Sequence, residues 1–282
     1  IREGVMRRTL LLLTASLAVV AACAKKAEAP AEAAAEAPAE ASEAAEPAPV
    51  VVDYAAVAAA AVADARRPEA DRADDERRKP ATALAFMQAG PGMAIFEIEA
   101  GAGWYTELLS HAVGDAGSVV MQNPEGFRSF VGEQIDARLK DNRLANVRQS
   151  LSNFDTLDAA DASIDVATWV QGPHELYFTP SDGVTLGDPA KSYAEIFRIL
   201  KPGGVFAVID HSAVAGAPEA TGNELHRIDR EIVVAMAQTA GFTLEAESDF
   251  LANAEDPRTI TVFDPAIRGR TDQFALRFRK PR

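Results

Sequence analysis

The sequence predicts an α/β protein built on a doubly wound, mostly parallel β-sheet that closes with an antiparallel strand. Short apolar runs alternate along the chain with helical segments, which is typical of a parallel sheet covered by helices on both faces. The run IDVATWV at 164–170 is rich in β-branched and apolar residues, as expected of a strand buried on both faces. Near the C-terminus, two strand-like runs follow one another without a helix between them, which favours a closing antiparallel strand.

Local signals mark the individual elements. An alanine-rich segment and a short second helix precede a turn of Gly90, Pro91 and Gly92. The tetrad KPGG at 201–204 suits a type II turn, because Pro presets the second position and Gly accepts positive φ at the third. Parallel strands are expected at 94–98, 118–122, 147–151, 164–170 and 205–209, and closing strands at 242–247 and 273–279. Helices are expected at 54–65, 81–88, 104–113, 127–139, 193–200 and 228–240.

Residues 1–23 have the pattern of a lipoprotein-type signal peptide. Two arginines precede an apolar run at 10–20, and small residues lead to Cys23, the one cysteine of the sequence. The run is shorter than the ~20 residues that span a bilayer as a helix. The motif VAAC resembles a bacterial lipobox, and an ordinary signal peptide that contains a cysteine is the alternative. The lipobox interpretation predicts an exported cell-envelope lipoprotein, anchored through lipidated Cys23, and Ala24 implies sorting to an outer membrane.

Composition divides the rest of the chain. Residues 24–50 are nearly all Ala, Glu and Pro, and they lack the large apolar side chains that offset chain entropy, so a disordered tether is predicted. Residues 51–80 are a predicted helical extension, whose charge-dense part is either a solvated helix face or a lid. The folded domain is expected over 81–282. The formal net charge of −14 argues against a nucleic-acid partner, which requires a basic face.

The stretch FEIEAGAGWYTELLS runs from a predicted strand through a glycine turn into a helix. A turn after the first strand of such a sheet lies at its carboxyl edge, where ligands bind. Gly101 and Gly103 would let the backbone approach a ligand closely. The helix that begins near Trp104 directs its free N–H groups and partial positive charge to the same place.

Two acids beside this turn bear on the type of ligand. Glu97 and Glu99 lie two residues apart, so they would share one face of an extended strand end. Their carboxylates would repel a pyrophosphate, which disfavours NAD, FAD and ATP. They suit a ligand that carries an ammonium and a sulfonium group, as S-adenosylmethionine does. A solvated turn residue is the alternative for Glu99.

Several sequence blocks together resemble a family of predicted class I methyltransferases, many of which carry signal peptides. The blocks are GMAIFEIEAGAGWYTELLS, GSVVMQNPEGF, ILKPGGVFAVIDHSA, HRID, AGFTLEAESDFL and VFDPAIRGRTDQFALRFRKP. They run in order from about residue 65 to the C-terminus. The resemblance implies a seven-stranded sheet with an antiparallel last strand, S-adenosylmethionine as cofactor and transfer of a methyl group to an acceptor.

The resemblance also implies cofactor-binding roles for individual residues. Glu97 is the acid at the end of the first strand, and Gly101 and Gly103 form the turn. Asn123 follows the second strand, where an acid usually holds the ribose hydroxyls. An amide can accept one hydrogen bond and donate another, but it is a weaker partner than a carboxylate. Asp155 falls near the position that contacts the adenine.

Three histidines are placed to meet at the carboxyl edge of the sheet, namely His174, His211 and His226. In one interpretation they are catalytic, with His174 taking a proton from the acceptor, since a histidine has an ordinary pKa of ~6.5. In a second they bind a metal ion, together with Asp210 or Glu175. In a third they only bond to loop carbonyls. Asp210 could also fix the ring tautomer of His211.

Three functions therefore stay open. The preferred one is methyl transfer to a small molecule or an envelope component, with no resident metal assigned. The others are a metal-dependent enzyme of another class on the same scaffold, and a binding protein that has lost transfer chemistry. Export would separate the protein from the cytosolic source of S-adenosylmethionine. The sequence gives no indication of the acceptor or the oligomeric state.

Overall fold

The computed structural model describes residues 51–180 and 185–282. The predicted signal peptide and tether lie outside the described residues. The chain divides into two units at residue 50, and the sheet and its helices belong to the unit Val50–Arg282. Within the described residues, every helix is too short or too polar to cross a membrane.

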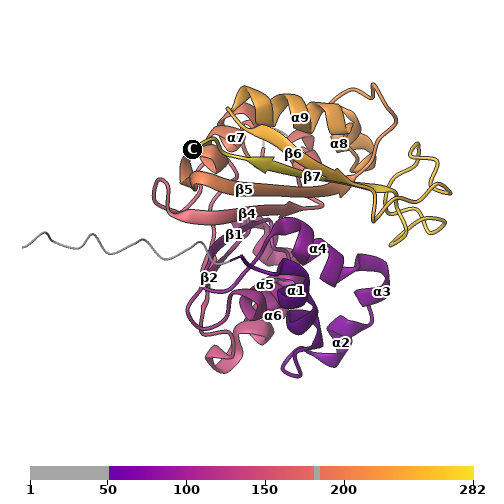
Figure 1. Cartoon of the computed structure of the whole chain (residues 1–282). Helices are drawn as coiled ribbons and strands as arrows, with labels where there is room; N and C mark the ends of the chain where they lie inside the picture. Colours follow the sequence, from indigo (N-terminus) through magenta and orange to yellow (C-terminus); the bar gives the residue numbers. More distant parts are fainter. Residues whose placement is uncertain (1–50, 181–184) are drawn as a thin grey trace, which may run out of the picture. The chain divides into compact units, whose positions relative to one another are not determined.

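Seven strands form one sheet in the order β3-β2-β1-β4-β5-β7-β6 (Figure 1). The strands are β1 (Ala94–Ile98), β2 (Ser118–Gln122), β3 (Val147–Ser150), β4 (Ile164–Val170), β5 (Leu200–His211), β6 (Thr243–Ser248) and β7 (Gln273–Arg279). The first five strands pair in parallel, whereas β7 runs antiparallel to both β5 and β6. The predicted fold class, a mostly parallel sheet with an antiparallel last strand, is confirmed. The strand order reverses between β1 and β4, which places a ligand crevice at the ends of these two strands.

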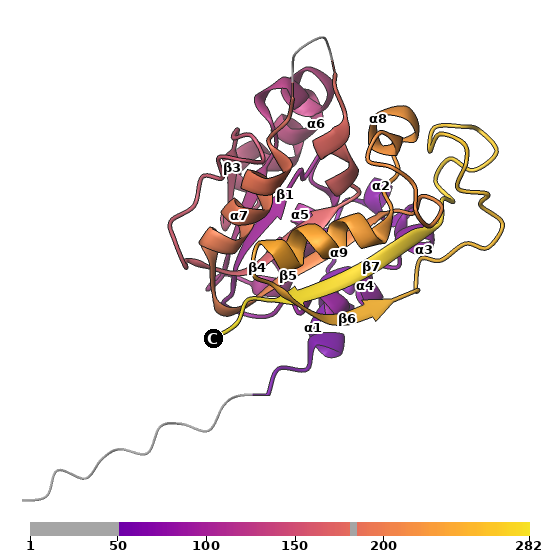
Figure 2. The same cartoon turned by 90° about the horizontal axis from the view of Figure 1, so that it is seen from above.

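Helices cover both faces of the sheet (Figures 1 and 2). They are α1 (Tyr54–Ala63), α2 (Glu69–Arg72), α3 (Asp75–Arg78), α4 (Pro80–Met87), α5 (Trp104–Val113), α6 (Arg128–Leu139), α7 (Pro189–Ile199), α8 (Thr221–Leu225) and α9 (Arg230–Thr239). Alternate side chains of β1 enter different cores. Phe96 and Ile98 pack with α7 and α9, whereas Ile95 packs with α1, α4 and α5. This alternation follows from the two-residue period of a strand.

Two elements extend several residues beyond their predicted bounds for identifiable reasons. β5 includes the KPGG tetrad, because the Gly203 N–H donates to the Lys280 carbonyl at 2.9 Å and the tetrad pairs with the end of the chain. Gly203 has a φ of 79°, the positive value that the tetrad predicts. α7 begins at Pro189, earlier than residue 193, because the Asp188 carboxylate accepts from the Lys191 N–H at 2.9 Å and caps the first turn.

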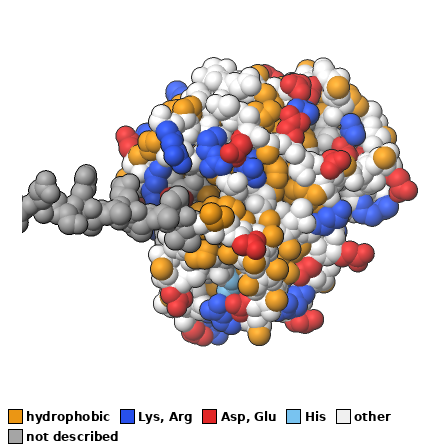
Figure 3. Space-filling view, in the orientation of Figure 1, with side chains coloured by type: hydrophobic (Ala, Val, Ile, Leu, Met, Phe, Trp, Pro, Cys, Tyr) orange, Lys and Arg blue, Asp and Glu red, His pale blue; other side chains and the backbone are white. Residues whose placement is uncertain are grey.

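The charge-dense segment before Pro80 packs against the domain. Arg67 is buried and pairs with Asp75 at 2.7 Å. Asp71 accepts from Arg138 of α6 at 2.8 Å, and its carbonyl accepts from the Trp104 indole at 2.9 Å. The segment therefore fixes the start of α5 and the end of α6 in place. On the face shown in Figure 3, basic and acidic side chains are interspersed with apolar ones.

Candidate functional site

A cavity of about 800 Å³ lies at the carboxyl edge of the sheet. Its wall comes from the turn after β1, the starts of α5 and α6, the segment after β4, and the loop between β6 and β7. Another hollow, of about 460 Å³, lies at the opposite ends of β2 and β3, away from the predicted site residues. The larger cavity is therefore the candidate site.

The glycine turn leaves room for a ligand on one side. Gly101 has φ of 56°, and a Cβ added there would meet no protein atom within 4 Å. Gly103 has φ of 83°, but a Cβ there would come within 2.7 Å of Arg138 and 2.8 Å of Met121. Gly103 is thus favoured by its positive φ and by the side chains packed against it, whereas Gly101 leaves an open space that a bound molecule can fill. This space fits the cofactor that the resemblance implies.

Asn123 lies beneath the turn, outside the cavity wall. Its Oδ1 accepts from the Gly101 N–H at 2.8 Å and its Nδ2 donates to the Gly101 carbonyl at 3.1 Å. Both polar ends of the amide are occupied, and the side chain is buried. Asp155 also lies outside the wall, where its carboxylate accepts from the Asp188 N–H at 3.2 Å. The ribose and adenine roles of these two residues stay predictions.

Glu97 is a buried acid at the wall of the cavity. It is 3% exposed and accepts a hydrogen bond from the Thr106 hydroxyl of α5. Burial raises the pKa of Glu97 to about 8, although Thr106 and Arg138 oppose the rise. The folded, ligand-free chain therefore holds a proton on Glu97 at neutral pH. A cationic ligand would favour the carboxylate form by direct attraction.

Glu99 does not share a strand face with Glu97, and that expectation is wrong. Its φ of 54° is left-handed, so the extended conformation on which the expectation rested ends one residue earlier. Its carboxylate accepts from the Trp169 indole at 3.0 Å, and its N–H donates to Gln122 at 2.9 Å. Burial raises the pKa of Glu99 well above its usual value, and the Glu175 carboxylate adds to the rise. Both acids nevertheless line the cavity.

The Glu97→Gln variant tests this burial through the pH dependence of stability. The unfolded chain releases the Glu97 proton near pH 4.5, whereas the folded chain holds it up to about pH 8. Between these values the folded state binds one more proton, so its free energy of unfolding falls by about 1.4 kcal/mol per pH unit. Relative to Glu97→Gln, the wild-type chain is expected to lose stability over this range and to lose no more above it. Urea unfolding at successive pH values measures the difference. A difference that is constant with pH would contradict the buried, protonated acid.

The three histidine rings lie together beside this cavity. The ring centroids of His174 and His211 are 5.8 Å apart, and those of His174 and His226 are 5.4 Å apart. Nδ1 of His174 lies 2.7 Å from Oδ1 of Asp210, and the His174 N–H donates to the other oxygen at 2.9 Å. Asp210 thus fixes the ring of His174. The ring of His211 instead contacts the Thr271 hydroxyl at 2.7 Å.

The charge states of these rings differ. Burial alone would lower the pKa of His174, but the Asp210 and Glu175 carboxylates raise it to about 10, so this ring is protonated at neutral pH. Burial lowers the pKa of His211 to about 3, so that ring is neutral. Among the described residues of this cluster, Glu175 lines the cavity, whereas the three histidines do not. The catalytic roles of His174, His211 and His226 therefore stay predictions.

Sequence reasoning missed several contributors to the site. The sequence predicted Glu175 only as an additional metal ligand, and it predicted no role for Gln122. Gln122 is a polar residue at the end of a buried apolar strand, which is a signal that could have identified it. Phe263 and Arg268 line the cavity from the loop between β6 and β7. No periodicity indicates the path of that loop.

The comparisons with known proteins agree with this geometry. A C-methyltransferase of Legionella pneumophila, named UbiE for ubiquinone and menaquinone biosynthesis, is 29% identical over 116 residues, which are 41% of this chain and 42% of that protein. The chain thus matches less than half of that relative's length. Two solved structures share the fold. A SAM-dependent methyltransferase from Aquifex aeolicus has a TM-score of 0.53 at 19% identity, and covers 74% of this chain and 95% of its own. The methyltransferase in a complex with the Trm112 activator of Haloferax volcanii has a TM-score of 0.54 at 16% identity. This match covers 76% of this chain and 93% of that chain.

The family assignment rests on the sequence match rather than on these distant folds. The model of the ubiE/COQ5 methyltransferase family matches residues 77–221, which is just over half of the 282 residues. The matched part contains the glycine turn, Glu97, Glu99 and the segment after β4. S-adenosylmethionine is the cofactor that this match supports. The chain belongs to the ubiE/COQ5 methyltransferase family.

Proposed function

We propose that the chain transfers a methyl group from S-adenosylmethionine to a small-molecule acceptor in the 800 Å³ cavity. The observation that carries this proposal is the continuity of the cavity, which joins the glycine turn after β1 to the segment after β4. S-adenosylmethionine supplies an electrophilic methyl group on a sulfonium. A cofactor on the turn side and an acceptor on the other side would meet within this one cavity, and such positioning is a large part of catalysis.

The turn side suits the cofactor. The open face of Gly101 allows close approach, and the start of α5 contributes its partial positive charge. The Glu97 and Glu99 carboxyls at the wall favour a cation. Trp104 and Phe130 add flat apolar surface, and Phe130 is otherwise 78% exposed. An apolar wall with a few charged groups is the usual composition of a small-molecule site.

The opposite side suits an acceptor that combines an apolar part with a hydrogen-bond donor. Phe178 and Phe263 supply aromatic surface, and Gln171 and Glu175 supply polar groups. Burial alone would raise the pKa of Glu175, but hydrogen bonds with the His174 and His226 rings lower it to about 2, so its carboxylate is ionised and accepts hydrogen bonds. Glu175 would hold a hydroxyl or amine of the acceptor by a hydrogen bond and so position the acceptor atom that receives the methyl group. An aromatic ring of the kind that quinone biosynthesis methylates is the first acceptor to test, given the name of the Legionella relative.

Calorimetry and label transfer test this function on the purified full chain. One equivalent of S-adenosylmethionine or S-adenosylhomocysteine is expected to bind. The labelled methyl group is then expected to appear in a small molecule from cell extract, and less so with Glu175→Gln. Failure to bind either adenosyl compound would refute the proposal. Tight binding without transfer to any extract component would favour the alternative of a binding protein.

Export and lipidation of the chain are a separate proposal, supported by the basic start, the apolar run and the VAAC motif. A single acyl chain binds membranes only marginally, so stable anchoring through Cys23 would require several. Labelled palmitate is expected to enter the wild-type chain and not the Cys23→Ser variant, which should leave the membrane fraction. Equal labelling of both chains would rule out this anchor.

A further inference from the structure

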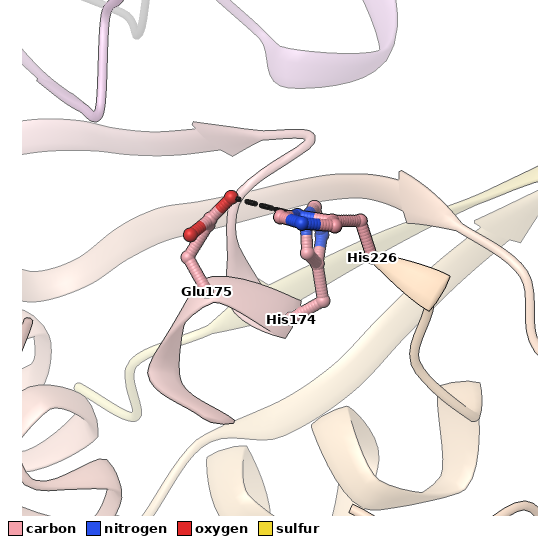
Figure 4. Close-up of side chains that lie close together, drawn as sticks. All are labelled: His174, Glu175 and His226. Carbon is pink, nitrogen blue, oxygen red and sulfur yellow. Dashed lines mark hydrogen bonds and ion pairs between the residues drawn. The ribbon is translucent and has the colours of Figure 1, made fainter. Parts of the chain in front are cut away.

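His174, Glu175 and His226 form a compact group of potential metal ligands beside the cavity (Figure 4). His174 and Glu175 come from the 3₁₀ turn after β4, and His226 follows α8. Each side chain offers one ligand atom, which is a ring nitrogen for each histidine and a carboxylate oxygen for Glu175. These three atoms all lie within 4.8 Å of one another. The side chains are 4%, 12% and 15% exposed, so this is a largely enclosed group rather than a surface cluster.

The distances within the group match a tetrahedral metal site. Oε1 of Glu175 lies 3.4 Å from Nε2 of His174 and 3.2 Å from Nδ1 of His226. Zinc binds histidine nitrogen and carboxylate oxygen at about 2.0–2.2 Å, which makes the edge of its tetrahedron about 3.3–3.6 Å. Two of the three edges thus have nearly the required length before any ion binds.

The surroundings orient these ligands. Asp210 lies 2.7 Å from Nδ1 of His174, which leaves Nε2 of the same ring directed at Glu175. A carboxylate behind a ligating histidine is the usual outer partner in metal sites. The His226 ring is held between Phe178 and Phe263, with centroids 4.7 Å and 4.9 Å away. These contacts restrict both rings to the positions that a metal would need.

A second, independent feature points to a missing partner. Oε2 of Glu175 is buried and has no hydrogen-bond partner within the part of the chain that the structure describes. A buried, unpartnered carboxylate oxygen is costly, and native structures usually satisfy such atoms with a donor or an ion. A bound dication would give this oxygen a partner. The His174 ring would release its proton on binding the ion, because a ligating imidazole is neutral.

We propose that His174, Glu175 and His226 bind one divalent transition-metal ion, in a site with an open position toward the cavity. Two histidines and one carboxylate are the ligand set of catalytic zinc sites and of non-haem iron sites. Because Glu175 itself lines the cavity, the open position faces the acceptor side. If methyl transfer is the function, an oxygen or sulfur atom of the acceptor would occupy that position. The metal site itself does not depend on the proposed function.

Zinc titration of the full chain tests the site. The protein is purified without a polyhistidine tag, stripped with chelator and titrated with ZnCl₂ by calorimetry, without any adenosyl compound. One equivalent is expected to bind, and a chain loaded with Co²⁺ is expected to show the visible absorption of tetrahedral coordination. Glu175→Gln and His226→Gln are each expected to weaken binding tenfold or more. Asp210→Asn changes the carboxylate that holds the His174 ring, and it is expected to weaken zinc binding by about 10–100-fold.

His111→Gln is the matched control. His111 is also a buried histidine beside a carboxylate, with Nε2 3.2 Å from Glu107, but it lies outside the proposed site. This variant is expected to bind zinc as the wild type does. The proposal is overturned if the stripped wild type binds no zinc, or if the Glu175 and His226 variants bind it as tightly. Circular dichroism confirms folding of each variant, and the His226 variant provides the test if a Glu175 variant does not fold. Adenosyl binding is measured separately, so loss of the metal site and loss of the proposed function give different results.

Discussion

The Gly101→Leu variant is expected to bind S-adenosylmethionine about a hundredfold more weakly than the wild type, or about 2.7 kcal/mol less favourably. A Cβ at this position meets no protein atom within 4 Å, so the new side chain enters the space that we assign to the cofactor. The loss arises from exclusion of the ligand and not from a clash within the protein. Calorimetry with S-adenosylhomocysteine measures it.

Gly92→Leu controls for the backbone cost of this change. Gly92 also has a positive φ, 75°, and also has no atom within 4 Å of an added Cβ, but it lies in the turn before β1, away from the cavity. Each substitution places a non-glycine residue in the left-handed region, at a cost of about 1–2 kcal/mol in stability. Only Gly101→Leu should also lose affinity. Equal affinities of the two variants would place the cofactor elsewhere.

The Asp256→Ala variant is expected to lose about 3–5 kcal/mol of stability, because it leaves the fully buried Arg227 guanidinium without its carboxylate. Arg227 pairs with Asp256 at 3.0 Å and also donates to the carbonyls of Ser212 and Ile260. The same carboxylate accepts from the Arg258 N–H at 2.9 Å. The substitution therefore removes several bonds that fix the loop between β6 and β7.

Asp158→Ala is the matched control for this loss. Asp158 pairs with Arg148 at 2.8 Å, but both side chains are about half exposed or more, and such a pair contributes less than about 1 kcal/mol. Chemical denaturation compares the two variants. Because the loop also carries Phe263 and Arg268 to the cavity, Asp256→Ala should weaken acceptor binding as well. Equal, small losses in both variants would show that the buried pair does not hold the loop.

Much of the fold can be predicted from local sequence patterns. The runs 94–98, 118–122 and 164–170 are strands with the predicted bounds, because each combines apolar residues with flanking turn signals. The helix after the glycine turn also begins and ends as predicted, at Trp104 and Val113. The closing strand at 273–279 is antiparallel because no crossover helix precedes it.

The details of the candidate site depend on contacts between distant residues, which local patterns do not reveal. Glu99 adopts a left-handed conformation that an acidic residue seldom takes, and its partner Trp169 lies 70 residues along the chain. The Asp210 carboxylate bonds to the ring of His174, 36 residues away, whereas from its neighbour His211 it accepts only the backbone N–H. Sequence position placed the three histidines at one edge, but their charge states follow from burial and from carboxylates that only the fold brings near them.

A crystal structure of the full chain with S-adenosylhomocysteine is the most direct test of the central claim, that the cavity after β1 and β4 receives the cofactor. The ligand is expected against the open side of Gly101, with its amino group toward Glu97 or Glu99 and its sulfur directed to the Glu175 side. A ligand bound at any other place on the domain, or a cavity that stays closed to a ligand present at saturating concentration, would contradict the claim.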